Sequence, residues 1–166
     1  RILPPYAKSP QEFDGCFTDR ADVPLCVFTA DCVPVLLCDP EAGVIAAAHS
    51  GWRGTVQDMM GSAVNKLISL GASTENICAA IGPAIDVCCF EVGPEVKDAV
   101  EALLGEDGKG LCLPGEGVPG KFMADIKETN RRRLLQLGVK PEHIDVSDVC
   151  TMCSRDLYWS HRATAG

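Results

Sequence analysis

The sequence predicts an α+β fold, and three observations support this prediction. Short apolar runs typical of buried strands fill the first part of the chain, at residues 13–18, 25–29, 33–38 and 44–48. Apolar residues then recur at helical spacing in three later segments, which begin at residue 52, at Pro94 and at residue 122. The strands and helices do not alternate strictly, so a mixed α+β arrangement is favoured over a parallel α/β sheet.

Turn and cap residues set the limits of these elements. The segment D-P-E-A-G at 39–43 suits a hairpin between two strands. The first helix is expected to end at Gly71, and the last, over 122–137, at Gly138. Two further strands are predicted at 77–81 and 144–146. The glycine-rich stretch 104–120 is predicted to be a surface loop.

Composition excludes several classes of function. With 166 residues and 46% apolar residues, the chain is expected to form one soluble globular domain. A net charge of −8 and only 5% aromatic residues argue against a nucleic-acid partner. No apolar run reaches the roughly 18 residues of a membrane span. We therefore expect no membrane association and no obligate protein partner.

The ten cysteines suggest a reducing, cytoplasmic compartment, because a chain of this size does not need disulfides. Adjacent cysteines are poorly placed for an unstrained disulfide. A C-x-x-C pair has half-zinc-site spacing, but no second pair follows at a suitable distance. We interpret eight of the cysteines as small apolar filler: Cys16, Cys26, Cys38, Cys78, Cys88, Cys89, Cys150 and Cys153. Cys32 is expected to be the only cysteine essential for metal binding.

Reactive side chains interrupt the apolar pattern at the ends of two predicted strands. Asp31 and Cys32 stand between two apolar runs, and His49 ends the next strand. A thiolate and an imidazole at one sheet edge suit tetrahedral zinc, or copper, on ligand type. They equally suit a cysteine nucleophile activated by histidine. Spacing alone leaves these alternatives open, together with a purely structural role.

The loop after His49 indicates an anion site. Gly51 precedes a predicted helix whose first N–H groups are unpaired, and Arg53 adds a fork of donors. Together these groups suit a phosphate or a carboxylate. The alternative is that Arg53 is an ordinary surface residue and that Gly51 serves packing.

Four blocks of sequence resemble the YfiH/YlmD family along essentially the whole chain. That family is known both as a laccase-domain polyphenol oxidase and as a purine nucleoside phosphorylase. The blocks are T-A-D-C-V-P-V-L-L-C-D-P (29–40), A-A-H-S-G-W-R-G (47–54), I-G-P-A-I-D-V-C-C-F-E-V-G-P-E-V (81–96), and C-T-M-C (150–153) with S-H-R (160–162). The resemblance implies an α/β/β/α layered sandwich with mixed sheets, formed here by one domain over residues 1–166.

The resemblance also implies a metal site. Cys32 and His49 stand at two ligand positions of the family, whereas its third ligand is a histidine in an upstream Q-V-H-G block that these residues do not include. We therefore expect the chain to lack the family's N-terminal portion and its extreme C-terminus. His161 is an alternative third ligand, and His143 is expected to lie in a solvated loop.

The implied function is metal-dependent purine nucleoside phosphorylase activity on adenosine, inosine or guanosine, with adenosine deaminase as a second activity. Purine nucleoside and phosphate would be the small-molecule partners and zinc the cofactor. Ser50, Gly51 and Arg53 are assigned to substrate binding, with Arg53 also catalytic. Asp31 or Asp125 is assigned as general acid or base.

Three alternatives remain open. Copper-dependent polyphenol oxidation is one, although three histidines in total are few for multicopper chemistry. The others are a metal-free Cys/His thiol hydrolase and a non-catalytic metal-binding protein.

Overall fold

A computed structural model describes residues 13–115 and 117–164. The hairpin predicted around 39–43 forms two neighbouring strands of its larger sheet. Strands β2 (Val33–Asp39) and β3 (Val44–Ser50) pair antiparallel along their whole length. The Asp39 carboxylate fixes the turn, because its Oδ1 accepts the N–H groups of Glu41 and Ala42, both at 2.9 Å. The hairpin prediction is confirmed.

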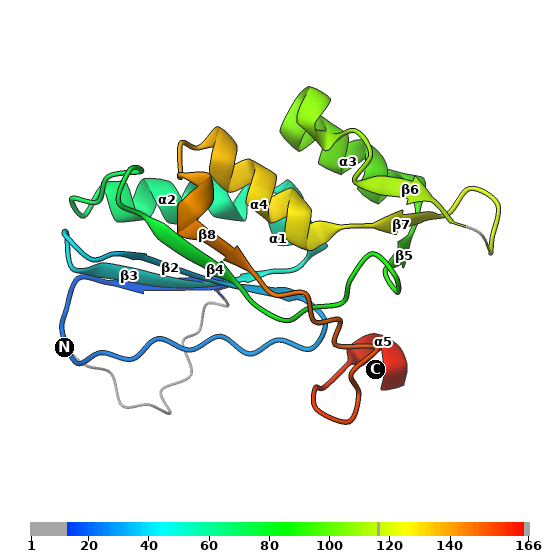
Figure 1. Cartoon of the computed structure of the whole chain (residues 1–166), viewed down its shortest axis with the longest axis horizontal. Coiled ribbons are helices and arrows are strands. Elements are labelled where there is room, and N and C mark those ends of the chain that lie inside the picture. The colour runs from blue at the N-terminus through cyan, green and yellow to red at the C-terminus, as the bar shows by residue number, and fades with distance from the viewer. Residues whose placement is uncertain (1–12, 116, 165–166) are drawn as a thin grey trace.

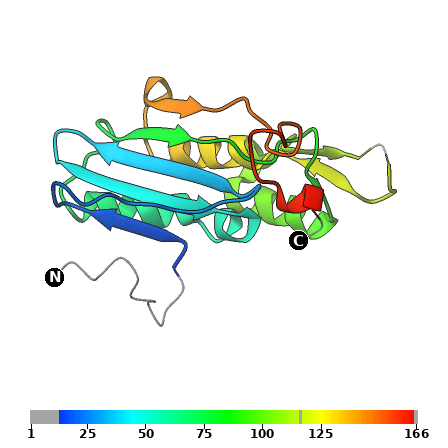
Figure 2. The same cartoon turned by 90° about the horizontal axis from the view of Figure 1, so that it is seen from below.

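Three more strands complete this mixed sheet, and a second, antiparallel sheet lies beside it (Figures 1 and 2). The larger sheet has the order β1-β3-β2-β4-β8, in which only β8 runs parallel to its neighbour, β4. The smaller sheet has the order β5-β7-β6. The remaining strands are β1 (Gly15–Thr18), β4 (Cys78–Ile81), β5 (Glu91–Val92), β6 (Cys112–Pro114), β7 (Phe122–Ala124) and β8 (Ile144–Val146).

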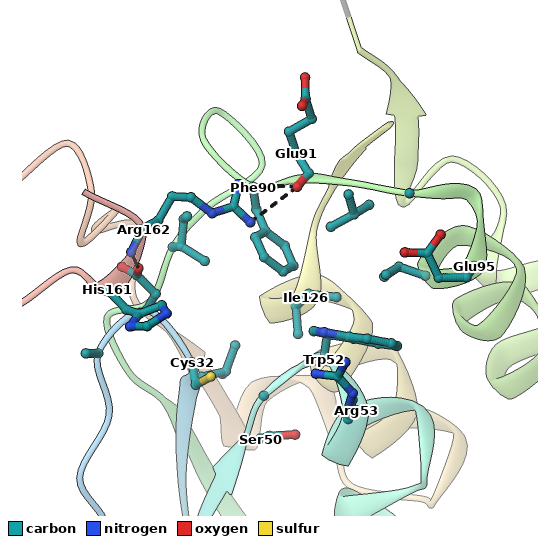
Figure 3. Close-up of a pocket in the computed structure, with 18 of the residues that line it drawn as sticks. Cys32, Ser50, Trp52, Arg53, Phe90, Glu91, Glu95, Ile126, His161 and Arg162 are labelled. Atoms are coloured by element: carbon teal, nitrogen blue, oxygen red, sulfur yellow. Dashed lines mark hydrogen bonds between the residues drawn. The ribbon is translucent and has the colours of Figure 1, made fainter. Parts of the chain in front are cut away.

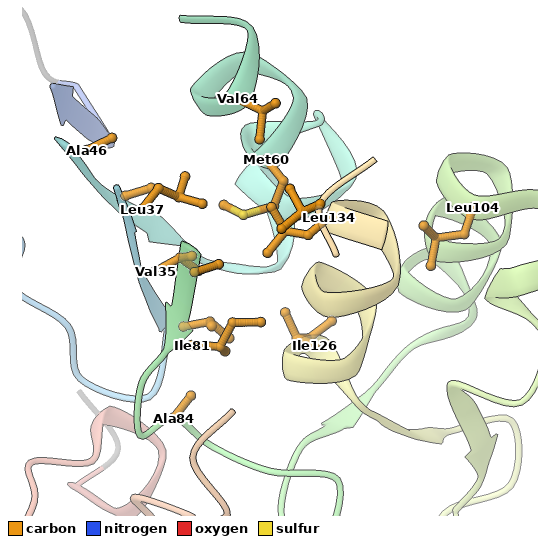
Figure 4. Close-up of a cluster of buried hydrophobic side chains, with 14 of the residues drawn as sticks. Val35, Leu37, Ala46, Met60, Val64, Ile81, Ala84, Leu104, Ile126 and Leu134 are labelled. Atoms are coloured by element: carbon orange, nitrogen blue, oxygen red, sulfur yellow. The ribbon is translucent and has the colours of Figure 1, made fainter. Parts of the chain in front are cut away.

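Helices cover one face of the larger sheet and enclose the core (Figures 1 and 4). Alternate residues of β2 are buried against them, including Val35 and Leu37, because side chains alternate across a strand. Met60 of α2 and Leu134 of α4 pack onto this face. The helices are α1 (Trp52–Val56), α2 (Met59–Ile68), α3 (Pro94–Leu104), α4 (Ile126–Gln136) and α5 (His161–Thr164), with 3₁₀ turns at Gly105–Gly108 and Pro141–His143. The predicted α+β class with mixed sheets is confirmed.

The opposite face of the larger sheet is more open. Leu36 of β2 points to this side and is 54% exposed. Extended chain that includes Leu25 runs along this face, next to Leu36 and Ile45 (Figure 2). None of the helices in the described residues has the length and apolar character to span a membrane.

Four predicted elements differ from the structure. The run 25–29 is extended but joins no sheet. The helix expected from residue 52 breaks at Asp58, which adopts a left-handed conformation (φ 63°) and caps α2. The helix expected over 122–137 begins only at Ile126, because Asp125 is its N-cap and the preceding residues form β7. The predicted loop 104–120 contains β6, which pairs with β7.

Candidate active site

A cavity of about 500 Å³ opens where β2 begins and β3 ends (Figure 3). The two strands are antiparallel, so the residue before β2 and the residue after β3 lie side by side, and both line the cavity. The turn before β5 and the C-terminal segment form other walls. The lining residues are Ala30, Asp31, Cys32, Val33, Ser50, Gly51, Trp52, Arg53, Ile85, Phe90, Glu91, Val92, Gly93, Glu95, Val96, Lys121, Ile126, His161 and Arg162.

The fold brings the predicted ligands Cys32 and His49 together at Gly51. A Cβ atom built on Gly51 would lie 2.9 Å from Cys32 Sγ and 3.8 Å from His49 Nε2. Since real Cβ atoms do not approach other heavy atoms at 2.9 Å, a side chain here would clash with the thiol and contact the imidazole. Glycine at position 51 therefore leaves a space into which both donor atoms reach.

Asp14 orients the histidine. His49 Nδ1 lies 3.2 Å from Asp14 Oδ1, and the backbone N–H of His49 donates to the Asp14 carbonyl at 2.7 Å. This contact engages Nδ1 and leaves Nε2 for the side of Cys32, as in the carboxylate–histidine pairs that support metal ligands. Burial raises the pKa of the Cys32 thiol, and the charges of Asp31 and Asp14 raise it further. A bound cation would favour the thiolate.

The third ligand is not found among the described residues. His161 lines the cavity, as Cys32 does. Within residues 13–115 and 117–164, however, the Cys32–His49 pair belongs to no group of three or more His, Cys, Asp or Glu ligand atoms within 4.8 Å of one another. In this structure His161 therefore does not complete such a group.

Two arginines backed by aromatic rings bring positive charge to the cavity (Figure 3). The guanidinium carbon of Arg53 lies 4.5 Å from the ring centre of Trp52. That of Arg162 lies 5.3 Å from the ring of Phe90, and both of its terminal nitrogens donate to the Glu91 carbonyl at 3.3 Å. The site-residue predictions missed Arg162, although the S-H-R block was its signal.

Asp31 cross-links the cavity wall. The residue is 8% exposed and its backbone has φ 78°. Oδ1 accepts a hydrogen bond from Thr151 at 2.7 Å, and Oδ2 accepts from the hydroxyl of Ser160 at 3.1 Å and from the backbone N–H of Arg162 at 2.7 Å. Both carboxylate oxygens are thus engaged in holding the C-terminal segment.

Ser50 and Asp125 have structural contacts of their own. The Ser50 side chain is fully buried, and its hydroxyl donates to Asn130 Oδ1 at 2.8 Å and lies 2.9 Å from Thr55 Oγ1. Asp125 caps α4 by accepting the N–H of Glu128 at 2.8 Å, and burial raises its pKa. Asp125 is not among the residues that line the cavity, although its neighbour Ile126 is.

Several side chains differ in solvent exposure from what the sequence predicted. Cys26, Cys88 and Cys153 are exposed, so the filler interpretation is wrong for them. His143 is half-buried, and its Nδ1 has no hydrogen-bond partner among the described residues.

The thiols of four cysteines lie within 4.8 Å of one another, namely Cys88, Cys89, Cys150 and Cys153. Sequence spacing missed this group because its two halves are brought together only by the fold.

The fold and site thus define an α+β protein with a Cys–His centre beside a cavity lined by arginines. Its sequence matches the family model described as multi-copper polyphenol oxidoreductase laccase over residues 3–166, and the chain belongs to that family. This confirms the family predicted from the four sequence blocks.

Curated relatives in this family have names from purine metabolism. The purine nucleoside phosphorylase YlmD of Geobacillus stearothermophilus is 39% identical over 97% of this chain and 58% of its own length. The adenosine deaminase RL5 of an unknown prokaryotic organism is 35% identical over 90% of this chain and 56% of its own length. The chain therefore spans slightly more than half the length of these relatives.

Solved structures support the same fold. The crystal structure of the Bacillus licheniformis hypothetical protein YfiH has a TM-score of 0.87 and 37% identity, covering 92% of this chain and 57% of that one. The structure of YlmD from Geobacillus stearothermophilus has a TM-score of 0.81 and 39% identity, covering 92% and 56%.

Proposed function

We propose that this chain provides the metal and phosphate sites of a purine nucleoside phosphorylase. The reaction would convert adenosine, inosine or guanosine and phosphate to the free base and ribose 1-phosphate, with adenosine deamination as a second activity. The observation behind this proposal is the meeting of Cys32 Sγ and His49 Nε2 at Gly51, beside a cavity with two arginines. The names of the relatives agree with it.

The residues of the centre fit a zinc ion. One thiolate and one imidazole are ligands that zinc prefers, and the side chain missing at Gly51 leaves room between them. Asp14 holds His49 in the tautomer that frees Nε2. A bound zinc ion would polarise a substrate oxygen or activate a water molecule. Copper also accepts these ligands, so the family's polyphenol oxidase description remains the alternative.

Arg53 is the proposed phosphate ligand. Its guanidinium is always charged, can bind two phosphate oxygens at once, and is held against the Trp52 ring rather than in an ion pair with another described residue. Helix α1 has only five residues, so its dipole adds little to this site. Arg162, which lines the same cavity, provides a second cation.

The aromatic rings and Asp31 complete the proposal. Phe90 and Trp52 line the cavity and offer ring faces for a purine base. Asp31 was predicted as a general acid or base, but its three hydrogen-bond donors favour a positioning role for the C-terminal wall. Asp125 is proposed to act only through its cap on α4.

The proposal is tested with the protein extended upstream to include a Q-V-H-G-like block, because these residues alone are expected to bind metal weakly. The purified protein is analysed for bound metal and incubated with inosine in the presence and absence of phosphate. We expect zinc, together with hypoxanthine and ribose 1-phosphate formed only when phosphate is present. Copper with oxidation of phenols would favour the polyphenol oxidase instead. Base release without metal and without phosphate would favour a thiol hydrolase. Metal without turnover of any substrate would leave a non-catalytic metal-binding protein.

A further inference from the structure

A second cluster of potential metal ligands lies outside the Cys32–His49 centre. The Sγ atoms of Cys88 and Cys89 are 3.7 Å apart, and Cys153 Sγ lies 3.7 Å from the first and 3.4 Å from the second. Cys150 Sγ completes the group, with all four atoms within 4.8 Å of one another. In a zinc site with Zn–S bonds of about 2.3 Å, tetrahedral geometry separates the sulfur atoms by about 3.8 Å. The observed separations are close to this value.

The fold explains why two distant segments meet here. Strands β4 and β8 run parallel, so the chain leaves both at the same end of the sheet. The pairing continues as a bridge between Ala84 and Cys150, and the N–H of Thr151 donates to the Ala84 carbonyl at 3.0 Å. The adjacent cysteines follow β4, and the C-x-x-C pair follows β8. The second pair, which sequence spacing could not supply, is therefore provided by the sheet.

A buried lysine holds the two segments in place. Lys127 is 4% exposed, and its Nζ lies 2.7 Å from Asp86 Oδ2, just before the first pair. The same Nζ donates to the carbonyls of Ser147 and Val149, at 2.7 and 3.3 Å, just before the second pair. The backbone N–H of Asp86 also points at Cys150 Sγ, at 3.4 Å. A backbone N–H that donates to sulfur stabilises the thiolate form, which is the form that binds a metal.

We infer that Cys88, Cys89, Cys150 and Cys153 bind one zinc ion as a closed tetrathiolate site, separate from the Cys32–His49 centre. Zinc binding would release the protons of those thiols that are still protonated, and no oxidation is involved. Four sulfur ligands leave no open position for substrate, so this site is structural. Chain leading from it continues into the cavity wall, at Phe90 on one side and Arg162 on the other. The zinc ion would therefore brace the wall that carries the second arginine.

The test removes the other centre first, so that the two sites are separated. The Cys32→Ser protein is freed of metal under reducing conditions and titrated with Co²⁺, whose thiolate charge-transfer absorption reports sulfur ligands. We expect about one equivalent of Co²⁺ with strong charge transfer, displaced by Zn²⁺. Adding Cys89→Ser or Cys153→Ser should weaken this absorption and lower the affinity at least tenfold. Adding Cys26→Ser, at an exposed cysteine outside the cluster, should change neither.

A second measurement needs no cluster variant and so remains decisive if those variants fail to fold. X-ray absorption on the zinc-loaded Cys32→Ser protein should give four sulfur neighbours at about 2.3 Å. Nitrogen or oxygen neighbours, iron in place of zinc, or disulfides among these cysteines in freshly reduced protein would each overturn the inference. So would charge transfer that survives in both cluster variants.

Discussion

Gly51 is the residue on which the Cys32–His49 centre depends most directly. Its backbone, with φ −63° and ψ 166°, is accessible to any residue, so alanine there brings no backbone strain. The added Cβ atom, however, would lie 2.9 Å from Cys32 Sγ. The requirement for glycine therefore comes from the space between the ligands and not from the turn.

Gly51→Ala is predicted to lower zinc affinity at the centre at least tenfold, because the thiol must move away from the new methyl group. The measurement is competition for zinc against a chelator, with thermal unfolding run alongside. Gly54→Ala is the matched control, since a Cβ atom there would have its nearest neighbour at an ordinary 3.6 Å. Equal affinities for wild type and Gly51→Ala would show that zinc does not bind between Cys32 and His49.

Arg53→Ala is predicted to raise the KM for phosphate about tenfold or more, since a charge-assisted hydrogen bond contributes about 1.5–3 kcal/mol. Arg53→Lys should recover part of the loss, because a single ammonium keeps the charge but not the two-point contact. Initial rates are measured against phosphate at saturating inosine. Arg20→Ala, at an exposed arginine outside the cavity, is the control. An unchanged phosphate dependence in Arg53→Ala would remove this residue from the mechanism.

At the scale of elements, Asp58 links α2 to α4. Its carboxylate accepts the N–H of Gly61 at 3.0 Å as the cap of α2. It also receives two hydrogen bonds from Arg133 of α4, at 2.8 and 2.7 Å. The hydrogen bonds from Arg133 are the main cause that lowers the pKa of Asp58. The residue that interrupts the predicted helix thus also joins α2 to α4 through these hydrogen bonds.

Asp58→Ala is predicted to lower the free energy of unfolding by about 1–2 kcal/mol. It removes the N-cap of α2 and the partly exposed ion pair with Arg133, which contributes little. Asp58→Asn, which tolerates the left-handed backbone and can still cap, should lose less. Because the folded pKa of Asp58 lies below its unfolded value, the ionic contribution is fully present above pH 4 and is lost as pH falls through the folded pKa. Urea unfolding of wild type and Asp58→Asn should therefore give different stabilities at pH 7 that converge as the pH falls below the folded pKa of Asp58. A difference that persists in acid would contradict this account.

Elements that depend on local pattern could be predicted from the sequence, and those that depend on distant partners could not. The hairpin of β2 and β3 follows from two apolar runs and the turn at Asp39, and it brings Cys32 and His49 to one end. The break at Asp58 involves Arg133, 75 residues away. The run 25–29 has a strand-like composition, but composition does not show that it lies on the face of the sheet, where it has no ladder partner.

At the scale of the molecule, the cavity gathers segments from nearly the whole described chain. Asp14 precedes β1, whose pairing with β3 brings it next to His49. Asp31 holds the C-terminal segment at Thr151 and Arg162, 120 and 131 residues further along the chain. The same contact holds the backbone of Arg162, whose side chain lines the cavity. The four-thiol cluster likewise depends on the parallel pairing of β4 and β8. Such contacts between residues distant in sequence depend on the topology of the fold, so motif spacing alone cannot show them.

The central claim is that the Cys32–His49 pair is the metal centre at which phosphorolysis takes place. The most direct measurement determines zinc content and phosphate-dependent cleavage of inosine together, in wild type, Cys32→Ser and Cys38→Ser. Cys38 is a half-buried cysteine of β2, the strand that follows Cys32. It lies outside the cavity and is the control. The account predicts that Cys32→Ser loses one equivalent of zinc and more than 99% of its activity, whereas Cys38→Ser keeps both. Full activity in Cys32→Ser, or activity lost with no change in zinc, would contradict it.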